Sequence, residues 1–354
     1  MKRYSNITPE GSRDFLFEEC DGRKAVESTL SALYKENSYR KVITPAIEFF
    51  DVFSSGNAGI EADYMYKLTD NYGRTTVLRP DNTMPIARLV ATRLRGADFP
   101  VRLYYNQNVF VKNKVLAGRT DEIPQSGIEF IGDGSMDADI EVISMAVEAL
   151  KRSDLSSFKI EIGHAGFFNA VLDKMHLTQT EKADICNFIE GKNYAALGDL
   201  LDKYENSAET QLLHRLPRMF GGTEVLEEAK QLYKSRESDE ALDYLKTLFE
   251  KLSDMGIADS VMIDLGLVNR SNYYTGVLFR GYAEGSGVTI LTGGRYDNLI
   301  AEFGLDIPAI GFAVDVNALC DVKNEIINVE RPIRIALTKG RLEKSSVKLF
   351  KAMG

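Results

Sequence analysis

The feature that most constrains the fold is a long helical block that lies between segments with strand character. From about residue 165 to 258 apolar residues recur at helical spacing, in runs such as FFNAVLDKMHL and ALDYLKTLFEKLSDMG, and glycines mark helix ends. Strand patterns flank this block, at 39–48 and 64–78 before it and at 262–279 after it. We therefore expect an α/β protein with a helical insertion between the strands of its core.

Composition restricts the class of protein and its location. The chain has 354 residues, of which 44% are apolar, so it can bury a full core and we expect more than one domain. Its first residues, MKRYSNITPEGSRDF, contain no hydrophobic signal segment, and no apolar run reaches the ~20 residues needed to cross a bilayer. We therefore expect a cytoplasmic protein with no membrane partner. The net charge of −9 weighs only mildly against nucleic acid, because an acidic average allows a local basic patch.

The spacing of cysteines and histidines argues against a metal site. The three cysteines lie far apart without a C-x-x-C pair, and the three histidines are equally dispersed: Cys20, Cys186, Cys320, His164, His176 and His214. Such spacing is typical of reduced, buried thiols and of histidines with structural roles. We expect neither a structural zinc nor another metal or cofactor.

The stretch from Arg102 to Gly132, RLYYNQNVFVKNKVLAGRTDEIPQSGIEFIG, resembles motif 2 of the class II aminoacyl-tRNA synthetases, in particular the histidyl-tRNA synthetases. In that family a strand runs to Phe-Arg, turns through a loop and returns through Gln-x-Gly and Glu. The frame is kept at Tyr104, Tyr105, Phe110, Gly118, Arg119, Gln125, Gly127 and Glu129. The family's arginine after Phe110, which holds the α-phosphate of ATP, is replaced by Val111, and a valine offers a phosphate no donor.

Three further segments resemble other motifs of that family. The helical pattern at 20–37 and the proline-bearing strand pattern at 39–48 correspond to motif 1, the dimer interface; read alone, the proline indicates only an edge strand or an interface. Residues 262–279 and 308–319 resemble the histidine-specific motif and motif 3, where the family's arginines fall on Asn269 and Ala318. Three replaced cations in kept frames argue against an adenylating enzyme, and we predict no catalytic residue.

By contrast, the polar residues matched to the family's histidine pocket are kept. The resemblance implies that Glu129 holds the imidazole, that Asp81 holds the α-ammonium group and that tyrosines flank the ring. The residues expected to bind histidine are Asp81, Thr83, Gln125, Glu129, Tyr273, Tyr274 and Tyr296. Read alone, the D-x-T-x-P sequence at 81–85 also fits a helix start, and the Gly-Gly pair before Arg295 fits a structural turn.

The last residues carry a second resemblance. RPIRIALTKGRLEKSSVKLFKAMG, at 331–354, has the pattern of a strand, a turn and a helix, and it resembles the N-terminus of the short-form ATP phosphoribosyltransferase catalytic subunit. We therefore predict a class II synthetase-like regulatory domain at 1–321, a linker at 322–332, and the first βα unit of a truncated catalytic domain at 333–354. A lone βα unit buries little surface, so we expect it to be disordered or to pack on a neighbour.

On these two resemblances the chain is identified as a member of the ATP phosphoribosyltransferase regulatory subunits, paralogues of histidyl-tRNA synthetase that lost aminoacylation. The resemblance implies an antiparallel sheet flanked by helices, in a homodimer that joins catalytic subunits, separate or fused, in a hetero-octamer without tRNA. The implied function is to activate the condensation of ATP with phosphoribosyl diphosphate, the first step of histidine biosynthesis, and to contribute to feedback inhibition by L-histidine.

Two alternatives and one question stay open at this point. A histidyl-tRNA synthetase with a variant ATP site would need other cations near the phosphates, such as Lys112, Lys114 or Arg270, and a separate anticodon domain. A stand-alone histidine sensor would act on a different partner. Histidine itself would bind either in the kept pocket or at the interface with the catalytic subunit.

Overall fold

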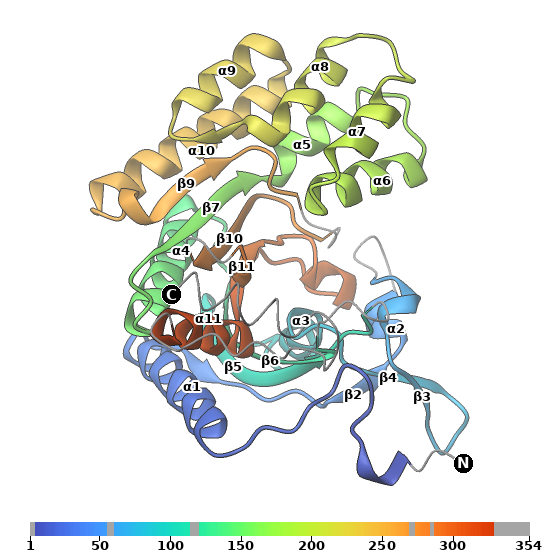
Figure 1. Ribbon diagram of the computed structural model, residues 1–354, viewed down its shortest axis with the longest axis vertical. Coiled ribbons are helices and arrows are strands. Elements are labelled where there is room, and N and C mark those ends of the chain that lie inside the picture. Colours follow the sequence, from blue (N-terminus) through green and yellow to red (C-terminus); the bar gives the residue numbers. More distant parts are fainter. Residues whose placement is uncertain (1–3, 55–59, 114–119, 269–272, 284–286, 329–354) are drawn as a thin grey trace, which may run out of the picture.

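The computed structural model describes residues 4–54, 60–113, 120–268, 273–283 and 287–328. Its main feature is a nine-stranded sheet that runs through the molecule (Figure 1). In sheet order its strands are β1 (Arg40–Lys41), β5 (Val101–Phe110), β6 (Glu122–Ile131), β12 (Ala309–Asp315), β11 (Thr289–Arg295), β10 (Val277–Ala283), β7 (Phe158–His164), β9 (Val261–Asp264) and β8 (Phe220–Gly221). Among these strands, only the pairs β1–β5 and β7–β9 are parallel.

The hairpin of β5 and β6 separates two apolar cores, because successive residues of a strand face opposite sides of the sheet. Ile128 and Phe130 of β6 enter the larger core on one face. Ile131, together with Tyr105 of β5, enters the smaller core on the other face. Glu129 lies between Ile128 and Phe130 in the sequence, so its side chain is directed to the face of the smaller core.

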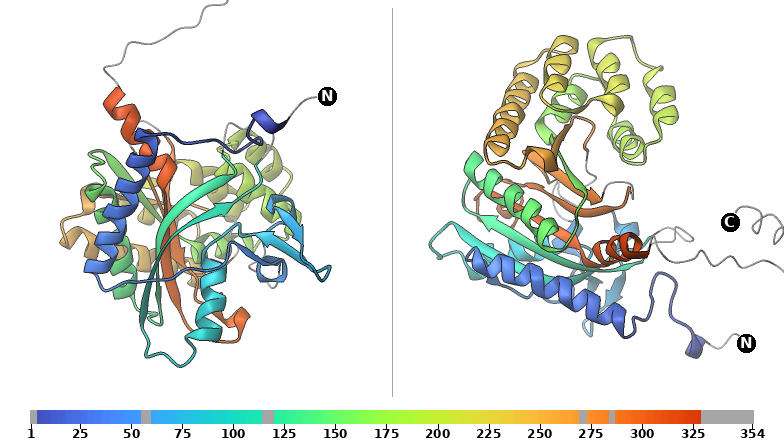
Figure 2. Two further views of the ribbon diagram at one scale, coloured as in Figure 1. Left: turned by 90° about the horizontal axis from the view of Figure 1, so that it is seen from below. Right: turned by 60° about the vertical axis from the view of Figure 1, so that its left-hand side comes forward.

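Three helices cover the face of the larger core: α1 (Glu18–Glu36), α4 (Met136–Arg152) and α11 (Val316–Asn328). Figure 2 shows α1 and α11 side by side, and both helices contact β6. In α4 the buried residues Val142, Ile143, Ala146, Ala149 and Leu150 recur at spacings of three and four, which places them on one stripe. Burial of this stripe fixes α4 against the sheet.

The opposite face carries α3 (Thr83–Arg93) and the short 3-10 helix η5 (Ile300–Phe303), which contact each other. Beside them lies a three-stranded antiparallel sheet in the order β2 (Ile47–Phe49), β4 (Thr75–Leu78) and β3 (Lys67–Thr69), and α2 (Asp51–Ser54) lies between β2 and β3 in the chain. The hairpin expected at 64–78 is thus confirmed. Four more single-turn helices are η1 (Tyr4–Asn6), η2 (Ala62–Tyr64), η3 (Leu216–Arg218) and η4 (Ala258–Ser260).

Six helices follow β7 in the chain and form a separate layer at that end of the sheet (Figure 1). They are α5 (Ala165–Leu172), α6 (Gln179–Glu190), α7 (Tyr194–Leu201), α8 (Ala208–Arg215), α9 (Glu224–Leu232) and α10 (Arg236–Asp254). The last of them, α10, contacts α5, α4 and β7, so it joins this layer to the sheet. The expected α/β architecture, a large sheet flanked by helices with a helical insertion, is confirmed.

Two strand predictions are wrong in extent. The pattern at 39–48 forms β1 and β2 in different sheets, because Pro45 has no N–H to donate and its carbonyl, like that of Thr44, accepts from Arg79. β1 does lie at the sheet edge, as the proline indicated. The pattern at 262–279 forms most of β9 and the start of β10, which are separate strands.

Some residues on which predictions rest lie outside the described structure. They are Asn269, Lys114, Arg270 and the tail at 329–354.

The described residues also bear on the membrane and thiol predictions. None of the described helices is long and apolar enough to cross a membrane. In the same part of the chain, no group of three His, Cys, Asp or Glu side chains is placed to hold a metal ion. The prediction of buried thiols is wrong for Cys20, which is exposed on the first turn of α1, while Cys186 and Cys320 are half-buried.

Candidate functional site

The site is built around Glu129, which is only 1% exposed. Thr83 Oγ1 donates a hydrogen bond of 2.9 Å to Glu129 Oε1, and the Tyr296 hydroxyl donates to Oε2. Burial raises the pKa of the Glu129 carboxyl to about 8, although the two hydrogen bonds lower it. No cationic side chain of the described residues forms an ion pair with Glu129. Without a cation beside it the buried group is mostly protonated at neutral pH, and a cationic ligand would stabilise it as a carboxylate.

Asp81 and Thr83 come from the start of α3. Asp81 Oδ1 accepts from the Met84 backbone N–H at 2.8 Å, so the helix-start interpretation of this sequence is confirmed. Burial raises the pKa of Asp81 to about 6, and Tyr273 also hydrogen-bonds its carboxyl group. The cap fixes the first turn of α3, and this turn sets the position of Thr83 against Glu129.

Three tyrosines form one side of the site. The ring of Tyr273 lies 4.7 Å from that of Tyr274 and 5.9 Å from that of Tyr296, measured between centroids, and the second pair meets edge to face at 81°. Burial raises the pKa of all three hydroxyls, so they stay protonated at neutral pH. They therefore act as neutral donors and as an aromatic surface for a flat ligand ring.

Two glycines leave room for side chains of the site, and sequence reasoning missed the first of them, Gly311. Gly311 of β12 is the direct partner of Glu129 on β6, and a Cβ at Gly311 would overlap the carboxyl group. A Cβ at Gly294 would lie 2.7 Å from the ring of Tyr274. The available signal was a glycine inside a strand pattern, which marks the close approach of another group.

Behind these residues lies a buried polar network that sequence reasoning also missed. Asn82, 1% exposed, donates to Gln125 Oε1 at 3.0 Å, and Gln107 Nε2 donates to Asn82 Oδ1 at 3.2 Å. Arg79 donates to Gln107 Oε1 at 3.3 Å and to the Thr44 carbonyl at 2.8 Å. The network joins the start of α3 to the central hairpin and orients Gln125. All seven residues predicted to bind histidine thus belong to one region connected by direct contacts.

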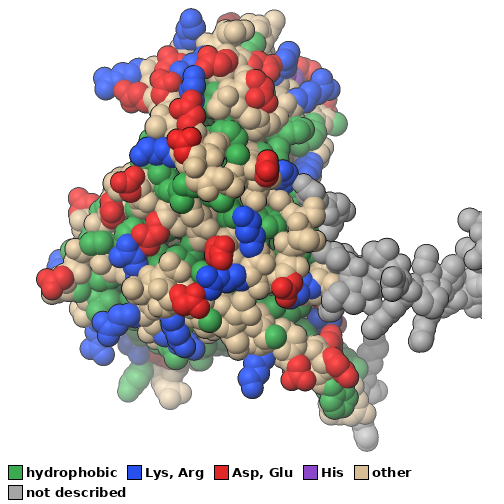
Figure 3. Space-filling model, turned by 90° about the vertical axis from the view of Figure 1, so that its left-hand side faces the viewer, with side chains coloured by type: hydrophobic (Ala, Val, Ile, Leu, Met, Phe, Trp, Pro, Cys, Tyr) green, Lys and Arg blue, Asp and Glu red, His purple; other side chains and the backbone are tan. Residues whose placement is uncertain are grey.

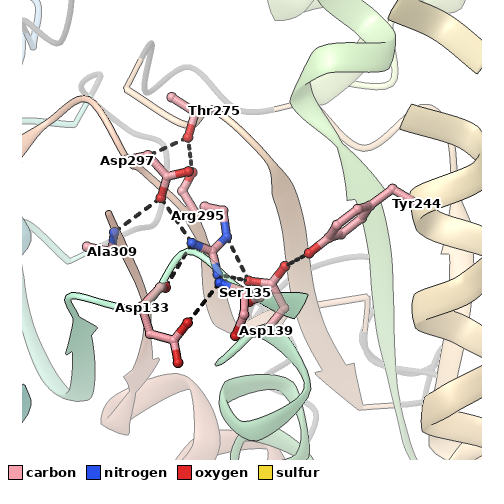
Figure 4. A network of polar contacts seen from close by, with 8 residues as sticks. All are labelled: Asp133, Ser135, Asp139, Tyr244, Thr275, Arg295, Asp297 and Ala309. Atoms are coloured by element: carbon pink, nitrogen blue, oxygen red, sulfur yellow. Dashed lines mark hydrogen bonds and ion pairs between the residues drawn. The ribbon is translucent and has the colours of Figure 1, made fainter. Parts of the chain in front are cut away.

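A buried ion pair supports the end of β11, directly before Tyr296 (Figure 4). Arg295, 5% exposed, binds Asp139 of α4 through Nε at 2.8 Å and Nη2 at 2.5 Å, and binds Asp297 through Nη1 at 3.0 Å. Tyr244 of α10 donates to the other oxygen of Asp139. The interpretation of the Gly-Gly pair as a turn is wrong, because Gly293, Gly294 and Arg295 form the end of β11. The arginine links the sheet, α4 and the insertion directly beside Tyr296.

Two of the three positions that the resemblance matches to family arginines, Val111 and Ala318, lie in the described structure, and both side chains are apolar. The backbone N–H of Val111 donates to the Asp121 carbonyl at 2.8 Å, which extends the β5–β6 pairing. Ala318 lies in the first turn of α11, where its N–H donates to Asp315 Oδ1 at 2.9 Å. Neither side chain can bind a phosphate.

Acidic and basic side chains alternate over the face that carries α1, α4 and α10, without a large basic patch there (Figure 3).

Comparison with known proteins agrees with this geometry. A family model described as histidyl-tRNA synthetase matches residues 11–319. The ATP phosphoribosyltransferase regulatory subunit of Clostridium novyi (strain NT) is 43% identical over 336 residues, which cover 94% of this chain and 80% of that protein. The protein of the same name from Clostridium acetobutylicum is 42% identical, covering 90% of this chain and 78% of its own length.

Solved structures give the same result. A crystal structure titled as an ATP phosphoribosyltransferase regulatory subunit/histidyl-tRNA synthetase from Bacillus halodurans aligns with a TM-score of 0.81 at 35% identity, over 90% of this chain and 84% of that chain. A histidine–tRNA ligase subunit from Alicyclobacillus acidocaldarius aligns with a TM-score of 0.79 at 27% identity, over 92% and 100%. The expected class II synthetase-like fold is thereby confirmed. The chain belongs to the family of ATP phosphoribosyltransferase regulatory subunits, which share their fold with histidyl-tRNA synthetases.

Proposed function

We propose that this chain is the regulatory subunit of an ATP phosphoribosyltransferase, that it has no catalytic activity of its own, and that it binds L-histidine in the Glu129 pocket. The relatives' names support the regulatory role in histidine biosynthesis. The observation that carries the histidine site is Glu129 itself, a buried carboxyl group with two hydroxyl donors and no cationic partner among the described residues. An imidazolium or ammonium group would supply that partner.

The geometry supports one orientation of the ligand. The imidazole would lie against Glu129 and the rings of Tyr273, Tyr274 and Tyr296. The α-ammonium group would lie near Asp81, the acid at the start of α3. In this orientation the pocket requires no contact with the ligand's carboxylate, so L-histidinol should bind as well.

The absence of adenylation is part of the same proposal. Val111 and Ala318 replace two phosphate-binding arginines, and the third position, Asn269, carries an amide. The alternative, a synthetase with a variant ATP site, would need another cation near the phosphates. Of the three candidates named above, Lys112 lies in the described structure, exposed just after β5. Exchange of pyrophosphate into ATP in the presence of histidine tests this point, and clear turnover would favour the synthetase.

We also infer a homodimer that joins catalytic subunits, within the hetero-octamer implied by the resemblance and without tRNA. An exposed apolar surface on and beside the three-stranded sheet, which includes part of the segment matched to motif 1, supports the homodimer. We term this surface the small-sheet face. Its residues and exposed fractions are Ile43 73%, Ile47 53%, Phe49 44%, Leu68 41% and Tyr72 84%. The domain boundaries, the fused catalytic segment at 333–354 and the cytoplasmic location stay predictions.

Calorimetric titration of L-histidine into the chain tests the pocket. We expect binding that Glu129→Gln abolishes and that Glu122→Gln, an exposed glutamate of the same strand, leaves unchanged. ATP should give no signal. A chain that binds no histidine would place feedback at the interface with the catalytic subunit. Failure to raise the activity of a short-form catalytic subunit on mixing would favour the stand-alone sensor.

A further inference from the structure

A second cleft, of about 430 Å³, lies between the helical insertion and the sheet. The sheet contributes Glu161 of β7, Asp264 of β9 and Arg280 of β10, while the insertion contributes Lys192 and Tyr194 from the α6–α7 region. In Figure 1 these helices lie above β7 and β10. The volume lies within the range of small-molecule sites, which is roughly 300–1,000 Å³.

Charges of both signs line this cleft without pairing to one another. Glu161 and Arg280 are direct partners on β7 and β10, yet the structure contains no ion pair between them. Arg280 instead donates to the Val268 carbonyl at 3.3 Å, and Asp264 accepts from the Gly266 N–H at 2.8 Å. Of the described carboxylates, none forms an ion pair with Arg280 or Lys192. Three acids, Glu161, Glu190 and Asp264, and two cations, Arg280 and Lys192, therefore line one cavity.

The pKa shifts of Asp264 and Glu161 show that the charges lining the cleft interact electrostatically with one another. Burial and, to a smaller extent, the charge of Glu161 raise the pKa of Asp264, whereas Arg280 and Lys192 lower it, and the resulting pKa is about 6. Burial likewise raises the pKa of Glu161, and Arg280 opposes this shift. Glu161, Asp264 and Arg280 are half-buried and form no ion pair with one another, while Lys192 is exposed at the rim. A ligand that carries both charges would give the half-buried groups charged partners.

The cleft is distinct from the Glu129 pocket. Its charged residues belong to β7, β9, β10 and the insertion, whereas Glu129 lies on β6 with partners on α3 and after β11. Two aromatic side chains, Tyr194 (43% exposed) and Phe220 (54% exposed), line the cleft and offer an apolar surface beside its charges. This combination fits a short zwitterion with a planar or apolar side chain.

We propose that this cleft is a second amino-acid site, in which Asp264 and Glu161 hold the α-ammonium group and Arg280 and Lys192 hold the carboxylate. The choice of ligand rests on the proposed function, which makes L-histidine the amino acid to which the chain responds. Unlike the Glu129 pocket, the cleft uses both charged groups of the amino acid. L-Histidinol lacks the carboxylate and imidazole-4-acetate lacks the ammonium group, so neither should bind there.

The test is calorimetric titration of L-histidine into the full chain, in the wild type and in three variants. We expect two equivalents in the wild type and one in Glu129→Gln. Lys192→Gln and Asp264→Asn should each weaken one of the two by about tenfold or more, since a lost charged partner contributes more than about 1.4 kcal/mol. Lys203→Gln, an exposed lysine of the same insertion outside the cleft, is the control. L-Histidinol should bind at one equivalent, unaffected by Lys192→Gln.

The outcomes separate the two sites. One equivalent of histidine that both cleft variants leave unchanged would overturn the cleft proposal and leave the Glu129 pocket standing. One equivalent that Glu129→Gln keeps and Lys192→Gln weakens would support the cleft and exclude the pocket. No binding in any form would exclude both. Should Asp264→Asn fail to fold, Lys192→Gln decides, because Lys192 is exposed and makes no hydrogen bond through its side chain within the described structure.

Discussion

Gly311 and Glu129 are direct partners across β12 and β6, and the side chain that Gly311 lacks is the space that the Glu129 carboxyl group occupies. A strand residue with a Cβ at 311 would push this carboxyl group away from Thr83 and Tyr296. The position of the Glu129 carboxyl group thus depends on the absence of one atom in the neighbouring strand.

Gly311→Ala should therefore destabilise the protein and abolish histidine binding. Overpacking of this kind costs roughly 1–3 kcal/mol, and the displaced carboxyl group also loses its hydrogen bonds. Urea unfolding measures the first effect and calorimetry the second. Gly22→Ala is the matched control. Gly22 lies in α1, and a Cβ added there would meet no atom within 4 Å. Alanine should therefore stabilise the helix by roughly 0.5–1 kcal/mol. Equal effects of the two substitutions would contradict the role of Gly311.

Glu129 should make the folding stability depend on pH. Its pKa is about 8 in the folded protein against an ordinary value of 4.5, so between these values the folded state holds a proton that the unfolded state has lost. Stability is then highest below pH 4.5 and falls as pH rises towards 8, by about 1.4 kcal/mol per unit. Asp81, with a pKa of about 6, contributes only below that pH.

Urea unfolding between pH 6 and 8 isolates the Glu129 contribution. Glu129→Gln cannot ionise and should flatten the pH dependence in this range, whereas Glu122→Gln should keep it. An unchanged slope in Glu129→Gln would mean that Glu129 is already ionised at pH 6.

The buried Asp139–Arg295 pair should contribute strongly to stability. Asp139→Ala leaves Arg295 buried without its main partner, which costs roughly 3–5 kcal/mol, while Tyr244→Phe removes one hydrogen bond and costs roughly 1 kcal/mol. The comparison is Glu240→Ala, since Glu240 and Arg236 form an ion pair with exposed side chains (64% and 85%) and should change stability by less than about 1 kcal/mol. Denaturant midpoints measure all three, and similar values for Asp139→Ala and Glu240→Ala would contradict the prediction.

A charge on the small-sheet face should disrupt the proposed homodimer. Phe49 is 44% exposed and lies under the guanidinium of Arg74, at 4.6 Å from the ring centroid, so Phe49→Glu places a carboxylate in an apolar patch. Sedimentation velocity should show a shift from dimer to monomer. Met255→Glu, at an exposed apolar site beyond α10, should stay dimeric. A dimer that survives Phe49→Glu would place the interface elsewhere.

The sequence allowed the helical insertion, the hairpin at 64–78 and the family to be predicted, because periodicity and motif spacing are local signals. It also named seven residues that the structure places in one region, although their binding of histidine stays a prediction. The support behind them was not predictable in the same way. Asn82, Gln107 and Arg295 act through partners that are distant in the chain, and no local pattern indicates that Arg295 meets Asp139 or that Gly311 makes room for Glu129.

The pairing of β6 with β12 has a consequence for how the chain acquires its structure. β6 is synthesised early, but its neighbour β12 emerges from the ribosome only after the whole helical insertion. Contacts of such large sequence separation form slowly, because a long loop must close before they are made. Until then one edge of the β5–β6 hairpin stays open, exposed to pairing with other chains. The site around Glu129 is thus a late product of folding, and protection against aggregation during synthesis depends on how quickly the last strand arrives.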